Sequence, residues 1–190
     1  MKKVALNDVD SASLGEESAR RSLSDPLGTT NVALNHYRIA PGDGLPGGLH
    51  AHMDQEEVFV VVAGEATFET MAGEITVGEG EAVRFEPGEF QSGANRSDTE
   101  LSVFALGAPR DTNDTRIPAT CPNCSHDTLR LEVGEESLQF VCPDCAAAFT
   151  PSDCPECGHA DLRITLGETT ATVVVCQNCV GQFETPPLRD

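Results

Sequence analysis

The stretch LHAHMDQEEVFVVVAGE, residues 49–65, decides the fold class of this chain. One residue separates His50 from His52, so in an extended strand both side chains lie on the same face. Glu57 opens the run of valines that follows, and Gly64 ends that run where a tight turn is expected. The stretch therefore predicts two β-strands that bring two histidines and a carboxylate together. Such a set is a candidate metal site.

Short apolar or alternating runs continue this pattern on both sides of the stretch. They are NVALNHYRI, EEVFVVVA, EATFETM, EITV, EAVRFE and ELSVFALG, and segments with glycine or proline separate them. Regularly spaced short strands of this kind indicate an all-β sandwich or barrel. We predict a barrel over residues 31–107, after an N-terminal arm at residues 1–30. In that arm VAL at 4–6 is a candidate edge strand, and SASLGEESARRSL is weakly helical or loose.

The spacing of the chemically distinctive residues in this region resembles the first signature motif of the cupin superfamily. The pattern is G-x5-H-x-H-x4-E-x6-G, formed by Gly44, His50, His52, Glu57 and Gly64. The resemblance covers about residues 32–107 and implies a jelly-roll β-barrel, which agrees with the strand pattern. Cupins include dioxygenases, isomerases, sugar binders and regulators, so the resemblance does not decide the function.

The segment GEAVRFEPGEFQSGAN, residues 80–95, resembles the second cupin motif, with two departures. Gly80, Gly88 and Asn95 are in register, but Glu86 stands where proline is usual. More importantly, Gln91 stands where the family has its third metal-binding histidine. The resemblance thus implies a barrel site of His50, His52 and Glu57, with Gln91 in the fourth place as a weaker, neutral oxygen ligand.

Fe(II), Mn(II), Ni(II) or Zn(II) would each suit this two-histidine, one-carboxylate set. The alternative is a metal-free pocket in which the histidines are polar residues beside a small molecule. Neighbouring residues in a strand point oppositely, so only one of His36 and Tyr37 can face inward, and Glu56 faces outward when Glu57 faces in. An inward Arg84 would favour an anionic ligand.

All eight cysteines lie between residues 121 and 179, in four Cys-x-x-Cys pairs. The pairs are Cys121/Cys124, Cys142/Cys145, Cys154/Cys157 and Cys176/Cys179. Seventeen residues separate the first two pairs and eighteen the last two, which is the spacing of a four-cysteine zinc ribbon repeated twice. A rubredoxin-like iron site and a disulfide scaffold are the alternatives, and nothing in the sequence suggests secretion.

Two similar segments support a duplicated ribbon, at residues 120–150 and 151–185, after a linker at residues 108–119. CPNCSHDTLRLEVGEESLQFVCPDCAAAF aligns with CPECGHADLRITLGETTATVVVCQNCVGQF, and in each a Gly-Glu turn joins two alternating strands. We expect two structural Zn²⁺ ions, each held within one repeat. Ligation shared between Cys142, Cys145, Cys154 and Cys157 stays open, because only eight residues separate those pairs. His126 and His159 follow their cysteine pairs and are not needed as ligands.

The composition is strongly acidic, with 31 Asp and Glu against 12 Lys and Arg and a formal net charge of −19. The only lysines are Lys2 and Lys3. This composition favours a salt-accumulating halophile such as a haloarchaeon over an ordinary acidic cytosolic protein. It also argues against nucleic-acid binding, because neither residues 1–119, with net charge −11, nor residues 120–190, with net charge −8, offers a basic patch.

No apolar run indicates a signal peptide or a membrane helix, so we expect a cytoplasmic protein without a membrane partner. The favoured function is a cupin that binds a small molecule through a barrel metal, with ribbons that contact a partner protein. The alternative is a metal-dependent enzyme, a dioxygenase or an isomerase. We also expect a homodimer, through an exposed barrel edge and the VAL segment.

Overall fold

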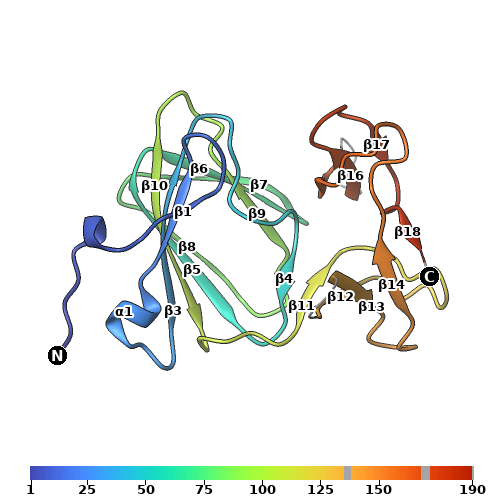
Figure 1. Cartoon of the computed structure of the whole chain (residues 1–190), viewed down its shortest axis with the longest axis horizontal. Helices are drawn as coiled ribbons and strands as arrows, with labels where there is room; N and C mark the ends of the chain where they lie inside the picture. Colours follow the sequence, from blue (N-terminus) through green and yellow to red (C-terminus); the bar gives the residue numbers. More distant parts are fainter. Residues whose placement is uncertain (135–137, 168–171, 190) are drawn as a thin grey trace.

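The computed structural model describes residues 1–134, 138–167 and 172–189, and nearly all regular structure in these ranges is β-strand. A barrel forms one end of the molecule and two cysteine-containing hairpin modules form the other (Figure 1). The helical segments are η1 (Leu6–Asp8), a single 3-10 turn, and α1 (Ser24–Leu27). Among the described residues no helix combines the length and apolar character needed to cross a membrane. The all-β fold class predicted from the sequence is confirmed.

The barrel consists of two antiparallel sheets. One has the strand order β1-β2-β3-β10-β5-β8 and the other has the order β7-β6-β9. The strands are β1 (Ala12–Ser13), β2 (Ala19–Ser22), β3 (Ala33–Ile39), β5 (Glu56–Ala63), β6 (Glu65–Thr70), β7 (Gly73–Gly78), β8 (Ala82–Phe85), β9 (Gln91–Ala94) and β10 (Leu101–Ala108). Apart from β1, β2 and β9, these strands cover the runs predicted from the alternating pattern.

The core fills the space between the two sheets. In β10 every second side chain is buried, including Leu101 and Val103, as expected when one face of a strand packs inward. Phe59 and Phe68 come from different sheets, and their ring centroids are 4.8 Å apart in a tilted arrangement. Phe85 completes this aromatic cluster, 5.4 Å from Phe68. Aromatic contacts of this kind hold the two sheets together beneath the candidate site.

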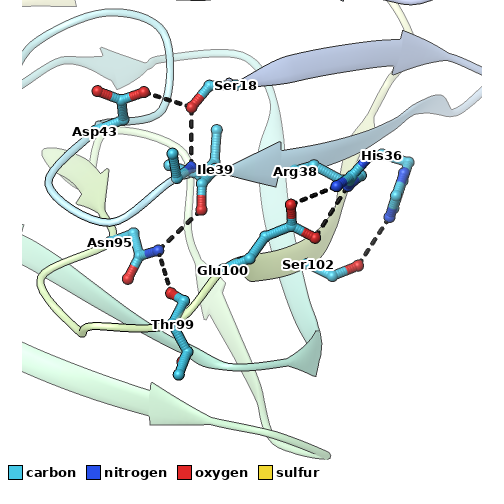
Figure 2. Close-up of polar contacts among 10 residues, drawn as sticks. Ser18, His36, Arg38, Ile39, Asp43, Asn95, Thr99, Glu100 and Ser102 are labelled. Carbon is cyan, nitrogen blue, oxygen red and sulfur yellow. Dashed lines mark hydrogen bonds and ion pairs between the residues drawn. The ribbon is translucent and has the colours of Figure 1, made fainter. Parts of the chain in front are cut away.

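Buried polar contacts fix the loops at the far end of β3 (Figure 2). Asn95 is fully buried, and its amide nitrogen donates to the carbonyl oxygens of Ile39 and Thr99, each at 2.8 Å. The hydroxyl of Ser18 donates to the carboxylate of Asp43 at 2.5 Å. These bonds satisfy groups that would be costly to bury unpaired, and they tie the N-terminal arm to the loop that leads toward His50.

The N-terminal arm differs from the expectation at both predicted features. VAL at 4–6 forms no strand, since Leu6 begins the 3-10 turn η1. The segment predicted as helical or loose contains β1 and β2, and β2 pairs with β3 in antiparallel register. The physical reason is tertiary, because the unpaired edge of β3 offers backbone partners that override the weak local preference of this segment.

Each cysteine module is a small antiparallel hairpin with an added strand. The first contains β12 (Leu129–Val133), β13 (Leu138–Val141) and β14 (Ala148–Pro151), and the second contains β15 (Leu162–Leu166), β16 (Thr172–Cys176) and β17 (Gln182–Phe183). A last strand, β18 (Leu188–Arg189), returns to pair with β14. The predicted Gly-Glu turns begin at Gly134 and Gly167, and the rest of both turns lies outside the described residues.

The predicted linker contains a strand of its own. β11 (Thr115–Ile117) pairs with β12 of the first module on one side and with β4 (Ala51–His52) of the barrel on the other. The resulting sheet has the order β18-β14-β13-β12-β11-β4. The strand that carries His52 is therefore the edge strand of the first module's sheet, and Figure 1 shows β4 on the side of the barrel that faces the modules.

Candidate metal sites

The three predicted barrel ligands lie together. His50 directly precedes β4 and forms an isolated bridge with Gln91, His52 ends β4, and Glu57 is the second residue of β5. One donor atom from each of the two histidines and the glutamate lies within 4.8 Å of the others. His52 Nε2 and Glu57 Oε2 are 3.6 Å apart. Ligand atoms about 2.1 Å from one ion are separated by roughly 3 to 4 Å, so these groups fit a single metal ion.

Hydrogen bonds orient both imidazoles for metal binding. His50 Nδ1 lies 2.8 Å from the carbonyl oxygen of Gly48. A carbonyl can only accept, so Nδ1 carries the proton and the neutral ring presents the lone pair of Nε2. His52 Nδ1 lies 3.0 Å from Thr115 Oγ1, which can accept the Nδ1 proton in the same way. Bonds from the second ring nitrogen to an oxygen are typical of metal-ligating histidines.

Burial makes the charge state of this group suitable for a cation. Desolvation lowers the pKa of His50, and it lowers the pKa of His52 to about 4, with the neighbouring His50 adding to the effect. Both rings are therefore neutral near pH 7 and free to act as ligands. Desolvation raises the pKa of Glu57 to about 7, against the opposing effect of the Gln91 hydrogen bond. A divalent ion would favour the carboxylate form of Glu57 by supplying the missing positive charge.

Gln91 lies beside the three candidate ligands, with its amide nitrogen directed at the carboxylate of Glu57. Its Nε2 donates to Glu57 Oε2 at 2.9 Å, and the residue is 4% exposed. In this orientation Gln91 holds the carboxylate in place, and rotation of the amide would present its oxygen instead. Its place as an oxygen ligand stays a prediction.

A cavity of about 220 Å³ adjoins the three ligands. Its polar lining includes Asn35, Tyr37, Gln55 and Arg110, and its apolar lining includes Phe59 and several small residues. Of the neighbours on β3, Tyr37 thus faces inward. His36 faces the other side of the sheet, where it contacts the ring of Phe104 and the hydroxyl of Ser102.

Side-chain contacts also show which way Arg84 and Glu56 point. Arg84 lies on the outer surface, where its guanidinium pairs with the carboxylates of Glu56 and Glu86. Glu56 therefore faces outward, as expected beside an inward Glu57. Arg84 does not reach the cavity, and its charge offers nothing to an anionic ligand there.

Sequence reasoning missed several residues at this site, among them Asn35 in β3 and two residues in the predicted linker. Arg110 lines the cavity while its guanidinium donates to the carbonyl of Thr29 at 2.6 Å and pairs with Asp25. Thr115 contacts the ring of His52. No local pattern marks either residue, because the contacts join positions more than 60 residues apart in the chain.

The eight cysteines form two compact clusters, each within one repeat. The first gathers Cys121, Cys124, Cys142 and Cys145, and the second gathers Cys154, Cys157, Cys176 and Cys179. Four measured Sγ···Sγ separations lie between 3.5 and 3.8 Å. Tetrahedral zinc with bonds of about 2.3 Å would place its sulfur ligands about 3.8 Å apart. Both clusters therefore fit a four-coordinate zinc ion, and the four sulfurs of each cluster come from one repeat.

The two histidines beside the cysteine pairs have other partners. His126 Nε2 lies 3.3 Å from the hydroxyl of Thr128, and His159 Nδ1 accepts from the backbone of Asp161 at 3.1 Å. The backbone carbonyls of both histidines accept from Cys121 and Cys154, respectively, and so help to shape the cysteine turns. These contacts agree with sites completed by four sulfurs.

The barrel residues match a known protein family. The family described as "Cupin domain" (Cupin_2) matches residues 35–107. Residues 35–107 are a cupin domain. The match contains His50, His52, Glu57 and Gln91, and it ends before both cysteine clusters. No curated protein matches the chain.

Solved structures with similar folds include proteins of several kinds. A sugar phosphate isomerase from a cupin superfamily, from Silicibacter pomeroyi, has 18% identity and a TM-score of 0.58, covering 76% of this chain and 94% of that chain. The polyketide cyclase RemF from Streptomyces resistomycificus has 22% identity and a TM-score of 0.53, covering 65% and 89%. At these identities the likeness shows the fold of the cupin domain and leaves its activity to its own residues.

The charge states above predict how metal binding to the cupin domain depends on pH. At pH 6 His52, with a pKa of about 4, has no proton to lose, and burial lowers the pKa of His50 as well, whereas Glu57, with a pKa of about 7, must release a proton when a cation binds. Affinity should therefore rise about tenfold per pH unit up to pH 7 and then level off. Calorimetry in buffers of different ionisation enthalpy should find about one proton released at pH 6 and almost none at pH 8.

Glu57→Gln is the control for this pH dependence, because the amide has no proton to release. The variant should bind metal more weakly and with no pH dependence between pH 6 and pH 8. Release of two or more protons at pH 6 in the unaltered protein would contradict the assignment, since it would mean that the histidines are charged before metal binds.

Proposed function

We propose that the cupin domain binds a divalent metal ion through His50, His52 and Glu57, and a small polar molecule in the cavity beside it. The single observation that carries the proposal is the orientation of the two imidazoles. An oxygen lies beside Nδ1 of each ring, which leaves each Nε2 free to bind a metal, and His52 Nε2 is 3.6 Å from Glu57 Oε2. Two histidines held in this way beside a buried carboxylate are poorly explained as ordinary packing residues.

The cavity supports a small ligand with hydrogen-bonding groups. Its volume of about 220 Å³ lies below the range of roughly 300 to 1,000 Å³ that is usual for larger ligands. Asn35 and Tyr37 line it, and both side chains carry groups that can hydrogen-bond to a ligand. Burial raises the pKa of Tyr37, so its hydroxyl stays protonated and can both donate to and accept from a ligand.

A three-ligand protein site leaves coordination positions open, and when bound the metal would supply a Lewis acid to a ligand oxygen. This favours a second candidate function, a metal-dependent enzyme such as an isomerase or a dioxygenase. Asn35 and Tyr37 would then orient the substrate. Turnover distinguishes the two functions, because a binding protein returns its ligand unchanged.

Water relaxation tests the proposal on the full chain prepared with two zinc ions, in the cysteine clusters only, and titrated with Mn²⁺. Mn²⁺ prefers nitrogen and oxygen ligands, so it should leave the thiolate clusters occupied by zinc. A bound Mn²⁺ with open positions should enhance water-proton relaxation, and sugar phosphates and hydroxy acids can then be screened for loss of that enhancement. Each hit is checked for chemical conversion. A protein that binds no Mn²⁺, or holds it with no exchangeable water, would refute the proposed site.

We further propose that each cysteine cluster holds a structural zinc ion. Four sulfur ligands leave no open position, which is characteristic of zinc that stabilises a fold and takes no part in catalysis. Contact between the ribbons and a partner protein stays a prediction, as does the homodimer.

We also propose that the protein works in concentrated salt, as its charge of −19 suggests. Raising KCl from about 0.1 M to about 1 M shortens the Debye length from about 10 Å to about 3 Å, which weakens repulsion among the acidic side chains. The melting temperature of the metal-loaded protein should therefore rise by several degrees over this range. A melting temperature that is unchanged or falls would contradict the adaptation.

A further inference from the structure

We propose that the two cysteine modules act as positioning elements for the barrel metal site, so that loss of their contacts weakens metal binding inside the cupin domain. This inference rests on the proposed barrel site. It goes further by assigning a role to the modules and to Thr115, which the cupin match at residues 35–107 does not include.

The stretch that carries the two histidines turns one face toward the barrel cavity and the other toward the cysteine modules. His50 and His52 face the barrel cavity, whereas Leu49 and Ala51 are buried, with 0% and 1% exposure. Leu49 lines a second, mostly apolar cavity together with Ile164 of the second module. Alternation along the strand thus anchors the outward side chains among the modules and aims the ligands inward.

The first module reaches His52 through β11. Thr115 pairs with His52 in the antiparallel register of β11 and β4, and Met53 N donates to the carbonyl of Asp114 at 2.8 Å. This pairing places Thr115 Oγ1 at 3.0 Å from His52 Nδ1. On its other side β11 pairs with β12, the strand that follows the Cys121/Cys124 pair of the first cluster. The partner of the ligand ring is therefore part of the sheet of the first module.

The second module reaches His50 through Gly48. Ile164 of β15 accepts a hydrogen bond from Leu49 N at 2.8 Å. A Cβ on Gly48 would lie 2.7 Å from the carbonyl oxygen of Ile164, so the backbones of the loop and of β15 are in close contact. The carbonyl of Gly48 is the group that accepts from His50 Nδ1. The Nδ1 partner of each ligand histidine is thus held by a different cysteine module.

This arrangement should strengthen metal binding by the barrel site. A metal gains most from ligands already held in the binding geometry, and loss of a partner on the second ring nitrogen of a ligand histidine typically lowers metal affinity about 10- to 100-fold. Each module is too small to hold much core, so its zinc would maintain the strands that supply these contacts. Thr115 is accordingly a positioning residue that acts through His52.

The test uses the full-length chain with zinc in the two cysteine clusters only, and it measures Mn²⁺ affinity by electron paramagnetic resonance of the free ion. Thr115→Val keeps the shape and strand preference of the side chain and removes the hydroxyl, and it should weaken binding about 10- to 100-fold. Thr115→Ser restores the hydroxyl and should return affinity to within about threefold of the unaltered protein. Thr150→Val, at a threonine in β14 of the same sheet, is the matched control and should bind normally.

A second readout separates positioning from general loss of structure. In the unaltered protein the ¹⁵N spectrum of His52, with diamagnetic Zn²⁺ in the barrel, should show a protonated Nδ1 and a metal-bound Nε2. Thr115→Val should alter this signature while both cysteine clusters keep their zinc. A substitution that only destabilised the fold would not be rescued by serine.

The outcomes distinguish this inference from the proposal on which it rests. If the unaltered protein binds no metal in the barrel, both fail. If it binds metal and Thr115→Val binds equally well, the barrel site stands and the positioning role is refuted. Weakened binding in Thr115→Val, with rescue by Thr115→Ser, supports both.

Discussion

The double substitution Cys124→Ser and Cys145→Ser is expected to remove one zinc ion per chain and to unfold the first cysteine module. Structural zinc in small four-ligand modules contributes about 10 to 16 kcal/mol of apparent binding free energy, which matches or exceeds the total stability of about 5 to 15 kcal/mol of an ordinary domain. The described core of this module contains few apolar residues, chief among them Ile117, Leu129 and Phe149. Such a core is too small to replace the metal.

Native mass spectrometry and NMR test this prediction together. The cysteine variant should carry one zinc ion fewer, and amide signals of residues 120–150 should collapse toward unfolded positions while those of the barrel strands remain dispersed. His126→Ala is the matched control, because His126 lies beside the same cluster but contacts Thr128. It should keep all its zinc. Retention of the full zinc content and of the module's signals in the cysteine variant would contradict a four-sulfur site.

The second large effect is expected at the barrel. His52→Ala should weaken Mn²⁺ binding by about 100-fold or more, because removal of a ligand costs several kcal/mol and each 1.4 kcal/mol is a factor of ten. The fold should survive, since His52 lies at the end of a two-residue strand and contributes nothing to the apolar core. Titration with Mn²⁺ of the protein that carries zinc in the two cysteine clusters only measures the change directly.

His36→Ala is the matched control for this substitution. His36 is also a buried histidine, 6% exposed, but it lies on the opposite face of β3 and contacts Ser102. Its loss should lower stability and leave Mn²⁺ affinity unchanged. Equal losses of affinity in both variants would show that binding follows general stability, and the assignment of His52 as a ligand would be wrong.

Features that depend on local periodicity could be predicted from the sequence. Alternation placed His50 and His52 on one face and separated Tyr37 from His36, because a strand has a period of two residues. The cysteine spacing identified two repeated hairpins, since each Cys-x-x-Cys turn presents two sulfurs toward one point. In both cases the candidate ligands lie close together in the chain. The fold then has to bring only a few short segments together to complete each site.

Features that depend on pairing between distant segments could not be predicted. β9 contains glutamine, serine, glycine and alanine, which have little strand preference, and it forms because β6 offers a partner. β11 lay in a polar segment interpreted as a linker, and only its two partner strands make it a strand. The roles of Thr115 and Arg110 follow from that pairing, so no motif could have indicated them.

Metal content per chain tests the central claim most directly. The full-length protein is expressed with zinc and iron supplied, purified in concentrated salt, and analysed by elemental mass spectrometry beside the double variant His50→Ala and His52→Ala. The three donor clusters predict about three metal ions per chain in the unaltered protein and about two in the variant. The two ions that remain in the variant should be zinc. About two metal ions in both proteins would contradict the barrel site.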